Sequence, residues 1–342
     1  MIDTVKLTLR GGYKIMEYDF FTPTARGFFE HPYYSLNGKD SFSCVQNPAA
    51  WDTSYKPRLT LTRIKGRGYL PTLSVEFSAP KLVYGENLSE LRDADFPKVL
   101  AMLQQTLEEM GVKVSPEVLA AASVGRVDYG KNIVLPEGTS CASVLRRLAK
   151  GSINRISANE RFFKNGGEAV EYRCNSFKLI FYDKQKEMQK DKWNAMIAKD
   201  SKFYGKEILR YELQLKDTKA VRRKLSLKKD SELKFKELFS EATSKAILQH
   251  FCSEIRKSLP LEASRQILLE RLSPKSKLTW FNAYVETFGA AAAKEKLLRE
   301  TGDNRTYKKL ITELDNLRKN LPPEPSPLDV ITEALEVFEP II

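Results

Sequence analysis

The stretch ILRYELQLK, residues 208–216, decides the fold class because its side chains alternate between apolar and polar from Leu209 onward. This period of two is the side-chain geometry of a half-buried β-strand. The carboxylate of Glu212 falls in the polar set. The apolar set is Leu209, Tyr211, Leu213 and Leu215. We therefore predict a strand that covers a core with one face and carries Glu212 on the other.

Two further stretches repeat this pattern with one carboxylate each. LSVEFSAPK (73–81) places Glu76 between apolar residues, and GRVDYGKNI (125–133) places Asp128 beside Val127. Exposed acidic residues are common on the solvent face of strands, which is the plain alternative. Carboxylates that converge on one sheet face can instead hold a hard divalent cation, which prefers oxygen ligands. We predict a metal site formed by Glu76, Asp128 and Glu212.

The stretch KLIFYDKQKE (178–187) ends a fourth candidate strand in Tyr182. A tyrosine phenol has a pKa of about 10, so as a nucleophile it needs a metal or a neighbouring cation. Lys184 and Lys186 follow closely, and Glu187 is a further candidate ligand or base. This set predicts metal-assisted cleavage of a phosphodiester by Tyr182. The alternative is an ordinary strand-end tyrosine, with its ring packed and its hydroxyl in water.

The apolar spacing predicts two regions with different secondary structure. Up to residue 216 it indicates strands over 2–10, 13–19, 57–64, 70–78, 121–129, 175–182 and 207–216, with helices near 96–110 and 139–150. This pattern is typical of an α+β domain, an antiparallel sheet with helices on one face. From residue 217 the spacing is helical, over 217–226, 231–257, 262–273, 276–299, 304–320 and 327–338. We predict an endonuclease-type domain at 1–216 and a helical C-terminal region at 217–342.

Charge favours a polyanionic partner. The chain of 342 residues has a formal net charge of +12, and lysine and arginine contacts to phosphates release condensed counterions. One basic stretch also carries Phe162 and Phe163, which could stack on unpaired bases. Its cations are Arg146, Arg147, Lys150, Arg155, Arg161, Lys164 and Arg173. The plain alternative is a solvated helix face followed by a loop.

Cysteine and histidine usage narrows the classes of site. The four cysteines form no CxxC pair, which argues against a zinc cluster or a disulfide framework and fits a reducing cytoplasm. The two histidines, His31 and His250, exclude a multi-histidine metal site. No apolar run approaches membrane-spanning length, so we expect no membrane partner.

Several segments in order resemble the filamentous-phage replication initiators, the phage gene II and X proteins, which are distant relatives of plasmid rolling-circle initiators. The segments are MIDTVKLTL, EHPYYSL, VEFSAPKLVYGEN, GRVDYGKN, LIFYDKQKE, ILRYELQLK and WFNAYVETFGAAAAKEKLL. The resemblance implies an endonuclease that nicks one strand at a double-stranded origin through a 5′-phosphotyrosyl link. It also implies that the enzyme later rejoins the displaced strand. The expected partners are phage or plasmid origin DNA and host polymerase and helicase in the bacterial cytoplasm.

By position, the resemblance implies that Tyr182 is the nucleophile, and it adds His31 as a candidate ligand and Lys81 as a phosphate contact. The strand motif of two histidines around a hydrophobic residue, known from other nicking enzymes, is missing here. Carboxylate ligands would favour Mg²⁺ or Mn²⁺. One rival is a non-catalytic origin-binding or single-strand-binding protein. Another is a tyrosine recombinase or a relaxase, although neither the arginine-and-histidine set nor the histidine cluster that these need is visible.

Overall fold

The structure is a computed structural model, and it describes residues 1–16, 28–34, 40–46, 55–64, 72–151, 156–190, 203–225, 233–258, 276–319 and 327–341. The chain forms two compact units. Residues 1–258 and 330–342 make up the first, which we call the sheet unit, and residues 259–329 make up the second, the helical unit. The helical unit is thus an insertion between two parts of the sheet unit.

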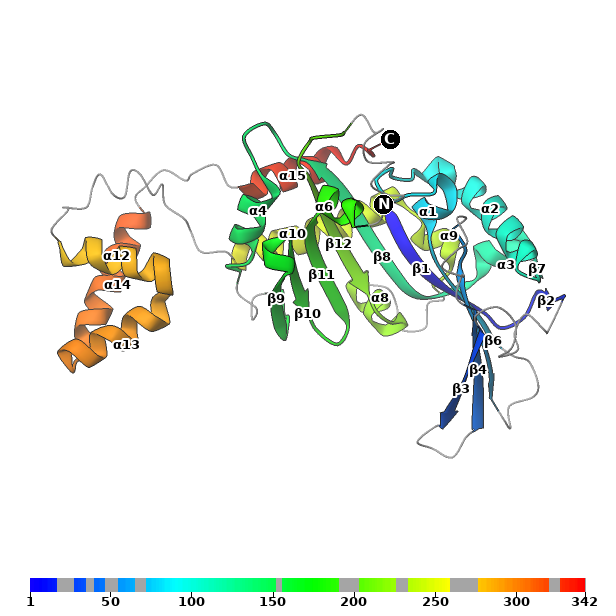
Figure 1. The fold of residues 1–342 in the computed structure, drawn as a ribbon, viewed down its shortest axis with the longest axis horizontal. Coiled ribbons are helices and arrows are strands. Elements are labelled where there is room, and N and C mark those ends of the chain that lie inside the picture. Colours follow the sequence, from blue (N-terminus) through cyan, green and yellow to red (C-terminus); the bar gives the residue numbers. More distant parts are fainter. Residues whose placement is uncertain are drawn as a thin grey trace. The chain divides into compact units, whose positions relative to one another are not determined.

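A ten-stranded antiparallel sheet dominates the sheet unit (Figure 1). Its order is β3-β4-β5-β6-β1-β8-β12-β11-β10-β9, and β2 pairs separately with β7. The strands are β1 (Ile2–Leu9), β2 (Tyr13–Ile15), β3 (Phe28–Tyr34), β4 (Asp40–Gln46), β5 (Arg58–Ile64), β6 (Thr72–Ser78), β7 (Val112–Val114), β8 (Ser123–Val134), β9 (Glu160–Lys164), β10 (Ala169–Arg173), β11 (Phe177–Asp183) and β12 (Ile208–Leu215). The predicted antiparallel sheet is therefore confirmed, and β3, β4, β7, β9 and β10 are strands that the pattern did not predict.

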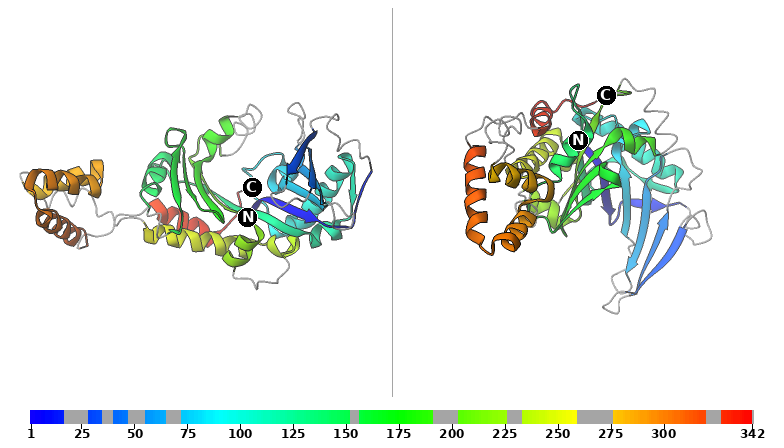
Figure 2. Two further views of the ribbon diagram at one scale, coloured as in Figure 1. Left: turned by 90° about the horizontal axis from the view of Figure 1, so that it is seen from below. Right: turned by 60° about the vertical axis from the view of Figure 1, so that its left-hand side comes forward.

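One face of this sheet is apolar and is covered by helices. Two buried tyrosines on that face fix the helices by donating hydrogen bonds to their carbonyls: Tyr211 to Leu248 at 3.0 Å and Tyr129 to Leu238 at 3.2 Å. The ring of Phe177 packs edge-on against Phe251. Leu238 is in α9 (Phe235–Leu238), and Leu248 and Phe251 are in α10 (Glu241–Ser258). Figure 2 shows these helices along one side of the strands. The other face carries the polar side chains that alternate with these apolar ones along each strand.

The helices of the sheet unit are mostly short, and several lie beyond residue 216. They are α1 (Ala79–Tyr84), α2 (Phe96–Glu109), α3 (Pro116–Ala121), α4 (Cys141–Leu148), α6 (Lys184–Gln189), α8 (Thr218–Lys224), α9 (Phe235–Leu238), α10 (Glu241–Ser258) and α15 (Pro327–Val337). Helix α15 contacts α10, where Gln249 donates to the carbonyl of Leu335 at 3.1 Å. The division between the compact units lies after Ser258. Helices α8, α9 and α10 belong to the sheet unit because they pack on the sheet.

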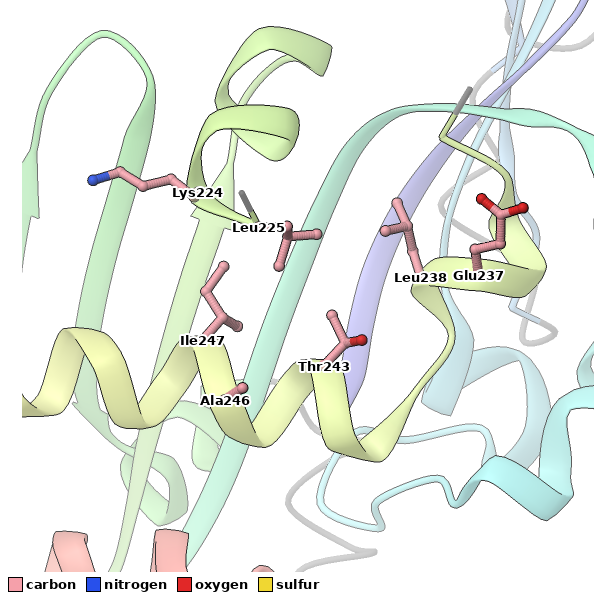
Figure 3. A pocket seen from close by; sticks show the side chains of 7 residues that line it. All are labelled: Lys224, Leu225, Glu237, Leu238, Thr243, Ala246 and Ile247. Carbon is pink, nitrogen blue, oxygen red and sulfur yellow. The ribbon is translucent and has the colours of Figure 1, made fainter. Parts of the chain in front are cut away.

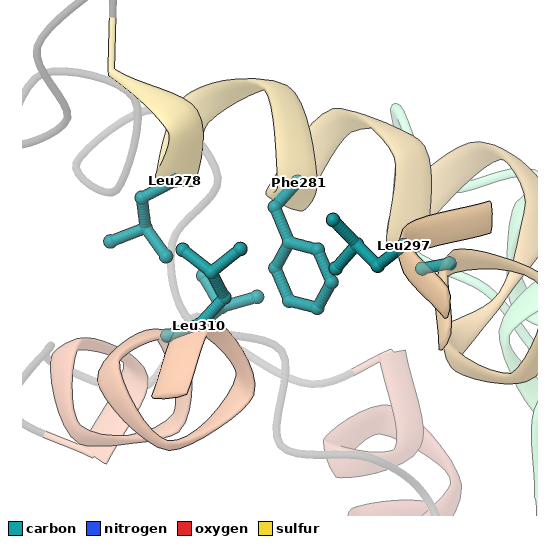
Figure 4. Packing of buried hydrophobic residues seen from close by; sticks show 6 residues of the cluster. Leu278, Phe281, Leu297 and Leu310 are labelled. Carbon is teal, nitrogen blue, oxygen red and sulfur yellow. The ribbon is translucent and has the colours of Figure 1, made fainter. Parts of the chain in front are cut away.

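The helical unit has its own small core. Helices α12 (Lys277–Phe288), α13 (Ala290–Thr301) and α14 (Asn304–Lys319) surround it. Figure 4 shows the core, which consists of Leu278, Phe281, Ala293, Leu297, Leu310 and Leu314. The single helix predicted over 276–299 is wrong, because Gly289 adopts φ +86° between α12 and α13. A left-handed or mirror-extended backbone is available to glycine at little cost, so the chain turns there.

Within the described part of the chain, no helix is both long enough and apolar enough to cross a membrane.

Candidate active site on the polar face of the sheet

Strand register brings Tyr182 and the predicted carboxylates onto one face. Residues directly opposite each other in an antiparallel pair point to the same side of the sheet. Tyr182 on β11 lies opposite Arg210 on β12, and Glu212 lies opposite Gly130 on β8. Asp128 lies opposite Gln214, which is two residues from Glu212 and therefore on the same face. The polar face is thus assembled from adjacent central strands.

The hydroxyl of Tyr182 points at Glu212. It donates a long hydrogen bond of 3.5 Å to Oε2 of that carboxylate, while the amide of Gln214 donates to Oε1 at 2.6 Å. Burial and the Glu212 carboxylate raise the pKa of the Tyr182 phenol well above its usual value, and Arg210 opposes this shift. Burial and the nearby Asp3 carboxylate also raise the pKa of Glu212. The Tyr182 phenol is therefore a weaker acid than usual, and it faces the Glu212 carboxylate, which is a stronger base than usual.

Arg210 is a buried cation held across the sheet. Its Nη2 donates to Asp3 Oδ2 on β1 at 2.5 Å, and its Nη1 lies 3.9 Å from Glu90 Oε1. The hydroxyl of Ser78 also donates to Asp3, at 3.1 Å. Burial alone would raise the pKa of Asp3, but the charge of Arg210 outweighs it and the pKa is lowered. The positive charge beside Tyr182 is therefore fixed in place.

Gly130 makes room for this cation. A Cβ atom built on Gly130 would lie 2.3 Å from Arg210 Nη2 and 2.5 Å from its Cζ. We expect Gly130→Ala to lower the free energy of unfolding by about 1–3 kcal/mol, as overpacking of a buried site does. Gly125→Ala on the same strand is the matched control, since its Cβ would meet no atom closer than 3.6 Å. Denaturant titration of both variants checks this, and equal stability of the two would contradict it.

The other two carboxylates share one arginine. Arg126 donates to Asp128 through Nε at 3.0 Å and Nη2 at 2.6 Å, and to Glu76 through Nη1 at 3.1 Å. Burial raises the pKa of Asp128 to about 8, against the opposing hydrogen bonds of Arg126. The side chain of Asp128 is 2% exposed and that of Glu76 is 27% exposed. Asp128 is thus the buried acid of the pair. Glu76 is partly exposed, and we describe it as lying at the rim of the site.

The carboxylates fit a divalent cation in part. Asp128 and Glu212 are buried acids with raised pKa values, both within the field of Asp3, and a bound cation would relieve the repulsion between these like charges. Glu76 and Asp128 both bond Arg126, and Glu76 is the more exposed of the two. Among the described residues, the set whose ligand atoms all lie within 4.8 Å of one another is a different one, Cys141, Asp183 and Glu207. Metal binding by Glu76, Asp128 and Glu212 stays a prediction.

A comparison with protein families gives a match over most of the chain. The model that describes the N-terminal part of a replication-associated protein, the phage gene II protein, matches residues 1–234. The chain belongs to the filamentous-phage gene II replication initiator family. The match covers every strand of the sheet and both members of the Tyr182–Glu212 contact, so the polar face belongs to the part that the family shares. Searches of curated proteins and of solved structures found no match.

The two lysines that follow Tyr182 in the initiator take different positions. Lys184 is fully buried, bonds Asn87 Oδ1 at 2.6 Å and Glu187 at 2.7 Å, and lies 6.0 Å from the centre of the Tyr182 ring. Burial lowers the pKa of Lys184. Lys186 is half exposed, and it lies 3.8 Å from a carboxylate oxygen of Glu168 and 4.0 Å from one of Asp183. The cation directly opposite Tyr182 is therefore Arg210, which the sequence analysis did not single out.

Glu187 forms an ion pair with Lys184. Its charge raises the pKa of Tyr182, so it belongs to the surroundings of the phenol. His31 lies on β3, whose side chains are outside the described part of the chain.

The predicted DNA-binding stretch is divided between the two faces of the sheet. Lys164 and Arg173 bond Glu171 on the Tyr182 face, at 3.0 Å and 2.8 Å. Arg161 lies opposite Tyr172, whose hydroxyl bonds α4 on the covered face, and Arg161 itself donates to the carbonyl of Gly151. Arg146 and Arg147 are on α4. Alternation along β9 places Arg161 and Lys164 on opposite faces of the sheet, so the stretch is not one surface.

Two further predicted DNA contacts are Lys81, outside this stretch, and Arg155, within it. Lys81 is in the first turn of α1, where its backbone N–H is capped by Ser78, the residue that also bonds Asp3. Arg155 lies outside the described residues. The backbone of Lys81 therefore lies close to the polar face, because the same Ser78 hydroxyl contacts both Lys81 N–H and Asp3.

The initiator also has a cavity of about 310 Å³ away from the predicted residues (Figure 3). Its lining comes from α8, α9 and α10 and is mainly apolar: Lys224, Leu225, Glu237, Leu238, Thr243, Ala246 and Ile247. It lies among the helices that cover the apolar face and adds no group to the Tyr182 site.

Proposed function

We propose that this initiator nicks one strand of its origin by transesterification and later rejoins it. The Tyr182 oxygen attacks the scissile phosphorus, the bond from phosphorus to the 3′ oxygen breaks, and a 5′-phosphotyrosyl link and a free 3′-OH result. Rejoining is the reverse: a 3′-OH attacks the phosphotyrosyl phosphorus and releases Tyr182. No phosphodiester energy is lost in either direction because one ester replaces another.

The contact between Tyr182 and Glu212 carries this proposal. A phenol with a raised pKa needs a base within hydrogen-bond reach, and Oε2 of Glu212 lies 3.5 Å from it. The phenol proton passes to this carboxylate as the new bond forms. The departing 3′ oxygen takes up a proton from water, and Glu212 releases its own proton to water afterwards. Apo sites often show such contacts at long distance, and they tighten when substrate binds.

Arg210 supplies the positive charge for the same step. It lies directly opposite Tyr182, and its charge lowers the pKa of the phenol against the other contributions. Among the described residues, Arg210 Nε is one of the few buried side-chain atoms without a hydrogen-bond partner. This arginine therefore has a donor left for the phenolate or for a phosphate oxygen, where charge-assisted bonds are strongest.

Asp128 and Glu212 are the residues that would hold Mg²⁺ or Mn²⁺, with Glu76 at the rim on the far side of Arg126. When bound, such a cation polarises the scissile phosphate and stabilises charge on the leaving 3′ oxygen. Lys184 keeps its place near the Tyr182 ring and holds Glu187 in an ion pair.

The experiment is conversion of supercoiled plasmid carrying the initiator's own origin to nicked circles, with Mg²⁺, Mn²⁺ or EDTA. We expect metal-dependent nicked circles at one position on one strand. A plasmid with the origin deleted is the control. Salt-sensitive binding to the correct origin with no nicked circles under any metal would favour the rival function, a non-catalytic origin-binding or single-strand-binding protein.

A further inference from the structure

Phe162 and Phe163 are neighbours on the edge strand β9, but they face opposite sides of the sheet. Phe162 lies opposite Glu171, which lies opposite Ile180, which lies opposite Glu212. Phe162 therefore shares the polar face with Tyr182. Phe163 lies opposite Val170 and, through it, Phe181, so it belongs to the apolar face. Both rings are exposed, to 36% for Phe162 and 52% for Phe163.

Two cations surround the Phe162 ring. Arg173 Cζ lies 4.9 Å and Lys164 Nζ 5.7 Å from the ring centre. Both cations also bond Glu171, whose pKa is lowered: burial would raise it, and the hydrogen bonds from Lys164 and Arg173 outweigh this. Glu160 and Lys178 also lie opposite Arg173 on this face, so three cations and two carboxylates give a net positive charge around the exposed aromatic ring.

The distance to the reacting groups suits a single DNA strand. β9 and β11 are separated by one strand, so they lie about 9.6 Å apart, and the residue of β11 in line with Phe162 is Ile180, about 7 Å along the strand from Tyr182. Phe162 therefore stands roughly 12 Å from Tyr182 on the same face. A few nucleotides of extended single strand span this distance. Duplex bases are stacked on each other and would not present a free face to Phe162.

We propose that Phe162 stacks on an unpaired base of the strand being cleaved, a few nucleotides from the scissile phosphate. Lys164 and Arg173 contact the phosphates on either side of that base. Sequence-tolerant binding of single strands combines such aromatic faces with cations. This inference rests on the proposed function, because it takes the polar face as the site where the strand is cut.

The test measures binding of a single-stranded oligonucleotide from the initiator's origin by fluorescence anisotropy, with full-length protein. We expect Phe162→Ala to weaken binding about 10-fold or more, the range that loss of one base–aromatic stack produces. Phe162→Trp should retain binding. Phe163→Ala is the matched control, since it removes a more exposed ring from the same strand, and it should change binding less than about 2-fold.

The inference is overturned if Phe162→Ala binds normally, or if both alanine variants lose the same affinity while their melting temperatures equal that of the unmodified protein. Its failure can be told apart from failure of the proposed function. Normal nicking together with normal binding by Phe162→Ala would remove only the stacking role. Absence of any nicking by unmodified protein, with a Phe162-specific loss of binding, would remove the chemistry and keep the single-strand surface.

Discussion

Replacing Tyr182 by phenylalanine is expected to abolish covalent protein–DNA adducts while leaving DNA binding intact. The change removes only the phenol oxygen, which is the atom proposed to attack phosphorus. Loss of a nucleophile costs on the order of 10⁴-fold or more in rate. The ring keeps its place between Lys184 and the strand β12, so the fold should be retained. The measurement is the amount of DNA that stays attached to protein after denaturation.

Tyr204→Phe is the matched control for this experiment. Tyr204 is 60% exposed and lies outside the strands of the sheet, so its variant should form adducts at the normal rate. A normal yield of adduct from Tyr182→Phe would exclude Tyr182 as the nucleophile. Loss of both adduct and origin binding would instead indicate a structural role for the hydroxyl.

Replacing Asp128 by asparagine is expected to lower the nicking rate by at least about 100-fold, which corresponds to about 3 kcal/mol of lost transition-state stabilisation. Asp128 is buried and is one of two carboxylates proposed to hold the cation. Glu76→Gln should lower the rate by less than about 10-fold, since the Glu76 side chain is partly exposed whereas that of Asp128 is buried. Nicking at saturating Mg²⁺ and Mn²⁺ gives both values.

Both variants lose a contact to Arg126, so the comparison controls for the loss of an ion pair on this face. Melting temperatures report any difference in stability. A larger loss of nicking from Glu76→Gln than from Asp128→Asn would contradict the assignment of the buried pair and place the cation at the rim. A raised requirement for Mn²⁺ in Asp128→Asn alone would support it.

Most of what could be predicted about the sheet came from the alternation of apolar and polar residues along its strands. It placed Glu76, Asp128, Glu212 and Tyr182 on polar faces, because a period of two depends only on local geometry. It could not reveal β3 and β4 or the order of the strands, since neighbours such as β1 and β8 are distant in sequence. The role of Arg210 depends on that order. Arg210 on β12 reaches Asp3 on β1 across β8, which lies between these two strands. Gly130 on β8 leaves the room that this contact needs.

For the basic stretch, composition does not show which face of the sheet each side chain takes. Charge counts treat Arg146 through Arg173 as one patch, yet the β9–β10 hairpin sends neighbouring side chains to opposite faces. Lys164 and Arg173 remain with Tyr182, and Arg161 does not. The breaks within the predicted helices over 231–257 and 276–299 were also hidden, because apolar spacing continues across them while the backbone turns.

The most direct test of this account is identification of the residue that carries DNA after cleavage. Origin DNA labelled at the scissile position is incubated with initiator and Mg²⁺ or Mn²⁺, the adduct is digested with protease and nuclease, and the modified peptide is sequenced by mass spectrometry. The account predicts a nucleotide linked through its 5′ phosphate to Tyr182, in the peptide that contains LIFYDKQKE. A link to any other residue, or nicked origin DNA with no covalent peptide, would contradict it.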